Sequence, residues 1–242
     1  DQLCEEDRGH MAPYISLEPL RRNRSVIEPD EIVVCTEKIH GANARYCYRE
    51  GRLWCGSRKT IKKDLPGSDW WNAARRYDLG VQLARLQSHP LFSGLIFYGE
   101  VFGRVQDLDY GEPFVDLVIF DIFDTTLHVW VPFDAVRLVC KIAGLKVVPE
   151  LYRGPFRDIP ADLAEGKSLL GGDHPREGYV VKPLKERFDP RVGRVVLKFH
   201  GEGYLTRGGG KPKKRDEFRR EYPLAVEDLE QEYMAQPESV VQ

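Results

Sequence analysis

Short apolar runs that end beside a charged residue constrain this sequence more than any other feature. The first run, EIVVCT, spans residues 31–36 and leads to Lys38, with Gly41 three residues further on. A charge at the border of a buried strand is costly unless it faces a polar cleft. Such a lysine lies where a turn can bring the backbone close to a ligand. Because K-x-x-G is common by chance, this pattern alone does not separate a nucleophilic lysine from a solvated one.

Four more charged residues repeat this arrangement at the borders of later apolar runs. They are Arg58 in CGSRK, Glu100 in FYGE, Glu177 in EGYVVKP and Lys198 in VVLKFH. Each of them, taken singly, is typical of a protein surface. Two carboxylates and two or three cations that converge on one cleft are what phosphoryl or nucleotidyl transfer requires, since carboxylates hold Mg²⁺ and cations neutralise phosphate charge.

The rest of the pattern predicts an α+β fold of antiparallel sheets with a few flanking helices. Strands are predicted where short runs of β-branched or aromatic residues stand between turn signals, at residues 31–36, 43–48, 52–57, 95–103, 115–123, 127–131, 177–183 and 194–200. Helices are predicted over residues 68–88 and 132–144, and a second amphipathic stretch lies near 158–170.

The 242 residues are enough for one large domain with a sizeable core. We expect an irregular N-terminal lead-in over residues 1–30 and a main domain over 31–205. Residues 206–242 begin with RGGGKPKKRDEF, which is typical of a flexible basic linker, and continue into an acidic, helix-like tail. No apolar run is long enough for a membrane span, and no secretory signal pattern opens the chain.

Cysteine usage and charge narrow the classes of protein further. Five cysteines without a C-x-x-C pair argue against a disulfide scaffold or a zinc site and favour an intracellular location, cytoplasmic or nuclear. The net charge of −2 is unevenly distributed, and local patches rather than totals set the field at a groove. Binding of a polyanion therefore stays possible at three basic clusters. These clusters are Arg21, Arg22 and Arg24; Arg58, Lys59, Lys62 and Lys63; and Lys211, Lys213, Lys214 and Arg215.

In order and approximate spacing, six segments resemble motifs I, Ia, III, IIIa, IV and V of the covalent nucleotidyltransferases. These segments are TEKIHGAN, GSRK, FYGE, FDIF, EGYVVKP and LKF, and the resemblance covers residues 31–205. That superfamily contains ATP-dependent polynucleotide ligases and RNA capping enzymes. K-I-H-G followed by Asn43, together with EGYVVKP, is most similar to the RNA ligase 2 family, since DNA ligases and capping enzymes more usually have Asp where His40 stands. The resemblance implies a nucleotidyltransferase (ATP-grasp-like ligase) domain over residues 31–205.

The resemblance also implies a role for each matching position. Lys38 would attack the α-phosphate of ATP and carry AMP as lysyl-AMP. Glu37 would lie beside the adenine, and Phe120 would stack on it. The other nucleotide-binding positions would be Ile39, Asn43, Arg58, Glu100, Lys182 and Lys198, with Arg58 also at the RNA 5′-phosphate.

The same resemblance implies a catalytic set and a metal site. Lys198 at the α-phosphate and Glu177 would act with Lys38, and Glu177 and Glu100 would bind Mg²⁺ or Mn²⁺. A free lysine is neutral in only about one molecule in a thousand at pH 7, so a nucleophilic lysine needs a neighbouring cation or metal ion. We expect Lys198 and the metal ion to supply that influence, and His40 to have a structural role in the turn.

The implied function is an ATP-dependent RNA ligase that joins 5′-phosphate and 3′-hydroxyl RNA ends through lysyl-AMP and RNA-adenylate. Two alternatives stay open: a DNA ligase or GTP-using capping-type nucleotidyltransferase, and a non-catalytic module that binds RNA ends. RNA is the expected partner, with no membrane partner. The sequence does not specify the oligomeric state, and we expect a monomer.

Two departures from the family pattern stand out. Motif V usually contains two lysines as K-x-K, whereas His200 follows Lys198 here, and a histidine is a weaker phosphate clamp near pH 7. Ligases of this family also carry an additional C-terminal domain, for which the residues after Tyr204 are too few and too charged. We therefore expect either the nucleotidyltransferase part of a longer ligase or a minimal ligase.

Overall fold

The computed structural model describes residues 4–6, 8–111 and 113–207. The chain divides into two units, Asp1–Tyr204 and Leu205–Gln242. All of the sheet structure belongs to the first unit, and only residues 205–207 of the second are described. Beyond residue 207, the basic linker and helical tail expected over 206–242 lie outside the described residues.

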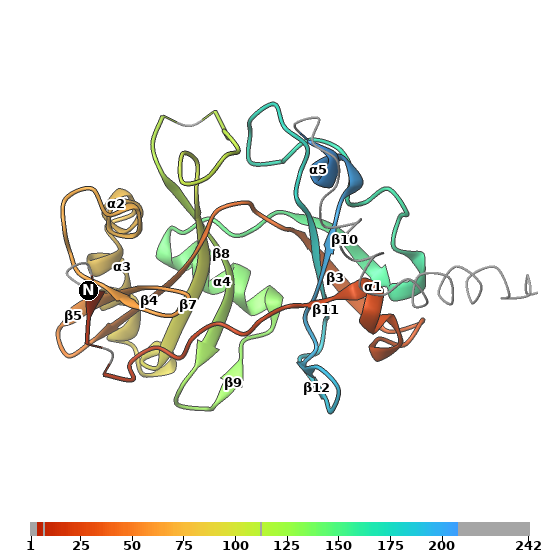
Figure 1. Cartoon of the computed structure of the whole chain (residues 1–242). Helices are drawn as coiled ribbons and strands as arrows, with labels where there is room; N and C mark the ends of the chain where they lie inside the picture. Colours follow the sequence, from red (N-terminus) through yellow and green to blue (C-terminus); the bar gives the residue numbers. More distant parts are fainter. Residues whose placement is uncertain (1–3, 7, 112, 208–242) are drawn as a thin grey trace, which may run out of the picture. The chain divides into compact units, whose positions relative to one another are not determined.

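A seven-stranded antiparallel sheet forms the larger part of the first unit (Figure 1). Its strands follow the predicted β-branched and aromatic runs, which suit a pleated, half-buried surface. In spatial order they are β1 (Cys4–Glu5), β6 (Ile61–Lys62), β5 (Arg52–Ser57), β4 (Ala42–Arg49), β7 (Leu95–Phe102), β8 (Asp116–Asp124) and β9 (Val129–Trp130).

A five-stranded sheet forms the second part of this unit. In spatial order its strands are β10 (Glu150–Pro155), β3 (Ile32–Glu37), β11 (Gly178–Pro183), β14 (Leu197–His200) and β2 (Glu18–Pro19). Its neighbours are antiparallel except for β14 and β2, which are parallel. Two short strands, β12 (Phe188–Asp189) and β13 (Gly193–Arg194), pair separately. The predicted α+β class with antiparallel sheets is confirmed.

The observed helices match those predicted from the sequence in part. Helix α4 (Phe133–Ala143) ends as predicted at Gly144, whose φ of +68° is the left-handed conformation that glycine adopts easily. The stretch predicted over residues 68–88 is two helices, α2 (Asp69–Arg76) and α3 (Leu79–Gln87). Between them Asp78 has a φ of +47°, a conformation that aspartate tolerates better than most residues.

The amphipathic stretch near residues 158–170 forms turns rather than a helix. The remaining helical segments are short: α1 (Leu20–Asn23), α5 (Glu202–Thr206), and the 3₁₀ turns η1 (Arg24–Val26), η2 (Pro90–Phe92) and η3 (Phe156–Asp158). Within the described part of the chain, no helix combines the length and apolar character needed to cross a membrane.

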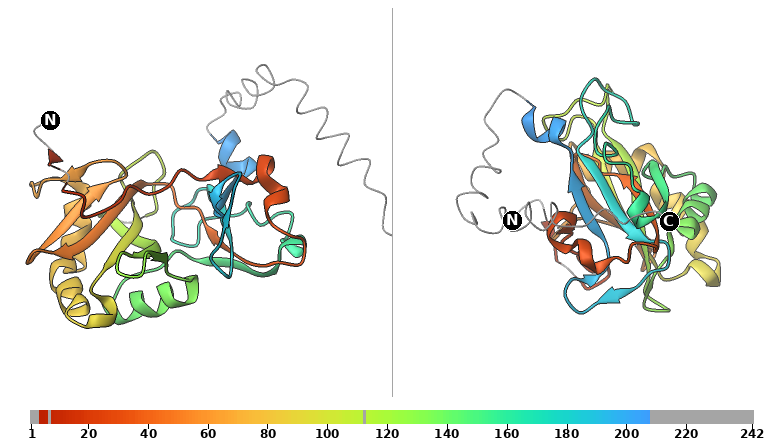
Figure 2. Two further views of the ribbon diagram at one scale, coloured as in Figure 1. Left: turned by 90° about the horizontal axis from the view of Figure 1, so that it is seen from below. Right: turned by 90° about the vertical axis from the view of Figure 1, so that its right-hand side faces the viewer.

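Helices α2, α3 and α4 cover one face of the seven-stranded sheet (Figure 2). Leu83 of α3 and Val136 of α4 bury their side chains there with Phe97 of β7. On the other side of this sheet, Tyr14 from the N-terminal segment belongs to a cluster with Tyr98 of β7. Residues 11–17 are thus packed against this sheet, while Leu20 and Val26 pack with residues of the five-stranded sheet.

The chain passes from one sheet to the other at the turn that contains Lys38. Strand β3 belongs to the five-stranded sheet and β4 to the seven-stranded sheet, and residues 38–41 join them. Gly41 is required in this turn, because a Cβ atom there would collide with the carbonyl oxygen of Val101 in β7. The close approach of the turn to β7 holds Lys38 at the boundary of the two sheets.

Candidate active site

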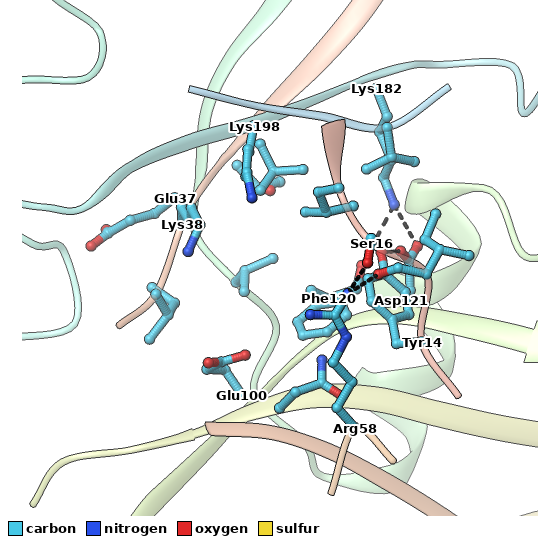
Figure 3. Close-up of a pocket in the computed structure, with 18 residues that line it drawn as sticks. Tyr14, Ser16, Glu37, Lys38, Arg58, Glu100, Phe120, Asp121, Lys182 and Lys198 are labelled. Carbon is cyan, nitrogen blue, oxygen red and sulfur yellow. Dashed lines mark hydrogen bonds and ion pairs between the residues drawn. The ribbon is translucent and has the colours of Figure 1, made fainter. Parts of the chain in front are cut away.

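A pocket of about 250 Å³ lies where the two sheets meet. It is lined from the five-stranded sheet by β3, β11 and β14, and from the seven-stranded sheet by β4, β7 and β8, with Arg58 directly after β5. Apart from Glu177, every predicted site residue lines it, namely Glu37, Lys38, Ile39, Asn43, Arg58, Glu100, Phe120, Lys182 and Lys198. Figure 3 shows the amines of Lys38 and Lys198 pointing into this space, with Glu100 below them and Phe120 to one side.

Glu177, the remaining predicted residue, is directly bonded to Lys38. The Lys38 Nζ atom donates to Glu177 Oε1 at 2.6 Å, and the Glu177 side chain is only 8% exposed. The backbone supports this pair, because the Lys38 amide donates to the carbonyl of Gly178 at 3.0 Å. Strands β3 and β11 therefore hold the amine and the carboxylate together from positions 139 residues apart in the sequence.

Two histidines share the Glu177 carboxylate with Lys38. His200 Nε2 lies 3.3 Å from Oε1, and His40 Nδ1 lies 3.3 Å from Oε2. Burial raises the pKa of this carboxyl, but the hydrogen bonds from its three partners hold the pKa well below its usual range. Glu177 is thus an ionised, nearly buried carboxylate beside the predicted nucleophile.

Glu100 and Lys198 belong to the same electrostatic environment. Burial raises the pKa of Glu100 to about 8, and the nearby Glu177 also raises it, while Lys38 lowers it. Burial lowers the pKa of Lys198, and the positive charge of Lys38 lowers it further. Two carboxylates and two ammonium groups therefore influence each other across this pocket.

Two oxygen atoms near the pocket have no hydrogen-bond partner within the described residues. Glu37 is 2% exposed, and its Oε2 accepts from the Leu169 amide at 2.8 Å, whereas Oε1 has no partner. The Oδ1 atom of Asn43 is also buried without a partner. A buried acceptor that is left unpaired costs free energy, so these atoms are suited to a ligand that carries N–H or O–H groups.

Arg58 contacts the N-terminal segment across the pocket. Its Nη2 atom donates to Ser16 Oγ at 2.6 Å and to the Ile15 carbonyl at 3.2 Å. Ser16 and Leu17 themselves line the pocket. Residues before position 31, expected to be a lead-in, therefore complete one wall of this site.

Lys182 lies at the far end of the pocket in a buried ionic cluster. Asp121 accepts from Lys182 Nζ at 2.6 Å and from Arg194 at 2.8 and 2.9 Å, and Tyr14 OH donates to it at 2.5 Å. Burial raises the pKa of Asp121, but Lys182 and Arg194 outweigh it and hold the pKa far below its usual range. Arg194 also binds Glu186 and lies over the ring of Trp130 at 3.9 Å.

His40 connects the turn after Lys38 to the β7–β8 connection, residues 103–115. His40 Nε2 lies 2.6 Å from Asp107 Oδ1, and the His40 amide donates to Tyr110 OH at 2.9 Å. Tyr204 OH lies 3.0 Å from His40 Nδ1. The hydrogen bonds to Glu177 and Asp107 raise the pKa of His40 against the opposing effect of burial.

The sequence-based prediction missed Tyr14, Ser16, Asp121 and Arg194. Asp121 had a usable signal, because an acidic residue in the middle of the apolar run VDLVIFDIF needs a buried partner. Arg194 opens the run RVVLKFH and gives a similar but weaker signal. Tyr14 and Ser16 had none, since they lie in a polar segment without strand or helix periodicity.

Comparison with known proteins identifies the family of this chain and relatives of its fold. The family described as RNA ligase matches residues 31–200. Among solved structures, Naegleria gruberi RNA ligase with PPi matches with a TM-score of 0.69 and 20% identity, over 86% of this chain and 61% of that chain. Mutant forms of the same ligase, one with ATP and Mn and one with AMP and Mn, match with TM-scores of 0.69 at 19% and 18% identity over the same shares of the two chains. No curated protein matches the chain at a significant level.

These comparisons differ in what they establish. The solved ligases are less than a quarter identical to this chain, so they show the fold, and the chain spans only 61% of their length. The family match extends over more than half of the chain and includes each of the strands that carry the predicted motifs. The chain therefore belongs to the RNA ligase family.

Proposed function

We propose that this chain is the nucleotidyltransferase part of an ATP-dependent RNA ligase, with Lys38 as the residue that becomes adenylylated. The observation that carries the proposal is the Lys38 amine, bonded to buried Glu177 and directed into a pocket with Lys198, Arg58 and Glu100. The proposed enzyme joins 5′-phosphate and 3′-hydroxyl RNA ends. AMP passes from Lys38 to the 5′-phosphate before the 3′-hydroxyl attacks and releases it.

In the first step the Lys38 amine attacks the α-phosphate, and pyrophosphate leaves. Glu177 holds the ammonium form of Lys38 in position and is the nearest acceptor for its proton. Lys198 stabilises the negative charge that develops on the α-phosphate, because its amine faces the same space. Arg58 exchanges its contact with Ser16 for a phosphate oxygen.

Recognition of adenine falls to Glu37 and Phe120. A carboxylate oxygen accepts hydrogen bonds, and Glu37 Oε1 is a buried acceptor without a partner in the described structure. Adenine offers an amino group at the position where guanine has a carbonyl oxygen. Glu37 therefore favours ATP over GTP, while the half-buried ring of Phe120 provides a stacking surface for the base.

A divalent cation, Mg²⁺ or Mn²⁺, fits the carboxyl oxygens of Glu100 and Glu177, and its charge would lower the raised pKa of Glu100 and favour the ionised form. The described residues contain no group of three or more candidate metal ligands, so phosphate oxygens and water would complete the coordination, as is usual for Mg²⁺. Such a cation would neutralise phosphate charge and would compete with the Lys38 ammonium for Glu177, which favours the neutral amine.

Self-adenylylation tests the proposal directly. Incubation with radiolabelled ATP and Mg²⁺, followed by denaturing electrophoresis, is expected to label the wild-type chain and not Lys38→Ala. Lys141 lies exposed on α4, so Lys141→Ala is a matched control that is expected to keep the label. No label on the wild type, or undiminished label on Lys38→Ala, would defeat the proposal.

The choice of nucleotide needs a separate labelling experiment. Radiolabelled GTP is expected to give at most a trace of the signal that ATP gives, because guanine places an acceptor opposite Glu37. Glu37→Gln supplies an amide donor at this position and is expected to narrow the preference for ATP. Equal labelling by both nucleotides in the wild type would contradict the role of Glu37 and would favour a capping-type enzyme.

A further inference from the structure

A second hollow lies between helix α2 and the β7–β8 connection, and no role assigned above uses it. This α2 groove has a volume of about 630 Å³. Asp69, Asn72 and Arg76 line it from α2 at spacings of three and four residues, which place them on one face of the helix. The β7–β8 connection contributes Arg104, Pro113, Phe114 and Val115.

The α2 groove combines an exposed aromatic ring with two guanidinium groups and one carboxyl group, that of Asp69. Phe114 is 67% exposed, which leaves a large apolar surface in water. The Arg76 guanidinium carbon lies 6.0 Å from the centre of the Phe114 ring, and its Nε lies 3.8 Å from buried Asp116, which orients it. Arg104 is exposed and forms no ion pair with the other described residues.

These groups match the chemistry of a nucleotide within a polynucleotide. A nucleobase stacks on an aromatic ring whatever its sequence, and a guanidinium binds phosphate oxygens. The Asn72 side-chain oxygen accepts from Arg75 at 3.1 Å, and its amide nitrogen at the groove edge can donate to a base. We propose that the α2 groove binds one unpaired nucleotide of the RNA, with its base on Phe114 and its phosphates at Arg76 and Arg104.

The β7–β8 connection links this groove to the candidate active site. Its inner side bonds to the turn after Lys38, since Asp107 and Tyr110 contact His40 and the Gln106 amide donates to the Gly41 carbonyl. RNA bound in the α2 groove therefore contacts the same β7–β8 connection that holds this turn. The inference rests on the proposed RNA substrate, but it concerns a surface separate from the nucleotide pocket.

Binding of a fluorescein-labelled single-stranded RNA to the full chain, followed by anisotropy, tests the groove. Phe114→Ala is expected to weaken binding by about fivefold or more, the effect of losing one base–aromatic stack, without changing the salt dependence. Arg104→Gln is expected to weaken binding and to make the slope of log K against log salt shallower by roughly 0.7. Both residues are exposed, so neither change removes core packing.

A control variant and the adenylylation assay show whether a change in RNA affinity is specific to the groove. Leu91→Ala with Arg85→Gln removes a similar exposed apolar side chain and charge elsewhere, and it is expected to leave affinity unchanged. Self-adenylylation of the groove variants is expected to stay within twofold of the wild type. If RNA affinity is unchanged in both groove variants, the inference is wrong. It is also wrong if self-adenylylation falls in these variants together with RNA affinity. Groove-dependent RNA binding in a wild-type chain that takes no AMP label would support the groove while refuting the proposed ligase.

Discussion

At the scale of single residues, the candidate site depends on a buried carboxylate that one lysine and two histidines share. Glu177 accepts from Lys38 and contacts His40 and His200, so polar partners surround it on three sides. A buried ionised group is tolerated only with such pairing. The family resemblance expects a second lysine where His200 stands, and the structure places His200 against Glu177, 3.3 Å from the oxygen that binds Lys38.

Replacing His200 with lysine is expected to maintain or raise self-adenylylation. A lysine carries its charge at every working pH and is a stronger phosphate clamp than an imidazole. The amount of labelled chain formed from radiolabelled ATP at pH 7 measures the effect, with His200→Ala as the variant that removes the ring altogether. Complete loss of label in His200→Lys would contradict the expectation.

Replacing Asp121 with alanine is expected to lower the free energy of unfolding by about 3–5 kcal/mol, because two buried cations lose their shared anion. The side chains of Lys182 and Arg194 are only 5% and 1% exposed. Urea unfolding followed by tryptophan fluorescence measures the change. Asp134→Ala, which removes a 60% exposed partner of Arg153, is the control and is expected to cost less than about 1 kcal/mol. If Asp121→Ala lowers the free energy of unfolding no more than the control Asp134→Ala does, the buried cluster adds no stability beyond that of an exposed pair.

The charged residues of the candidate pocket were largely predictable because they stand at strand borders, where a charge in an apolar context is visible in the sequence. Lys38, Glu100 and Lys198 were found in this way, and all three line one pocket. Asp121 and Arg194 were missed, since their partners come from segments far apart in the chain. Single-sequence patterns carry no information about such pairings.

At the scale of secondary-structure elements, sequence periodicity predicted the strands better than the helices. The apolar runs became β3, β4, β5, β7, β8 and β11 to within one or two residues. The helix predicted over residues 68–88 is broken at Tyr77 and Asp78, where Tyr77 OH donates to buried Asp116 at 2.5 Å. A tertiary contact of this kind overrides helical propensity and is invisible in a local pattern.

Strand β11 begins at a glycine that the pairing with β14 requires. Gly178 has a φ of +143°, and a Cβ atom there would collide with the carbonyl oxygen of Phe199. Gly178→Ala is therefore expected to lower the melting temperature clearly more than Gly51→Ala, where φ is also positive but no atom lies within 4 Å of the added methyl. Thermal unfolding of both variants measures this difference. Equal melting temperatures in the two variants would show that β11 and β14 accommodate the added methyl group without a loss of stability.

At the scale of the whole molecule, the first unit depends on contacts between segments distant in sequence. Both sheets contain strands from the N-terminal quarter and from later parts of the chain. The N-terminal segment illustrates the limit of sequence reasoning, because residues 1–30 lack periodicity and yet Met11 and Tyr14 are buried in the structure. We propose residues 31–205 as the nucleotidyltransferase domain, with this segment completing its pocket wall.

One such long-range contact predicts a pH-dependent stability. Arg187 donates to both oxygens of Glu31 at 2.6 and 2.7 Å and to the Val26 carbonyl at 2.7 Å, joining segments 156 residues apart. The hydrogen bonds from Arg187 lower the pKa of Glu31, although burial opposes this shift. A lowered pKa adds stability above the ordinary value of 4.5, and that stability is lost as the pH falls through the lowered value.

Glu31→Gln is therefore expected to lower the free energy of unfolding by about 1–2 kcal/mol at pH 7, because a charge-assisted pair of hydrogen bonds becomes neutral. The deficit is expected to shrink as the pH falls below 4.5 and through the lowered pKa of Glu31, because the wild-type carboxyl then becomes protonated. Urea unfolding of both proteins at pH 7 and pH 3.5 measures the two differences. Asp30→Asn, which changes a 76% exposed neighbour paired with Arg157, is expected to have little effect at either pH. A deficit in Glu31→Gln that stays constant between these pH values would mean that packing, and not the charge of Glu31, joins the two segments.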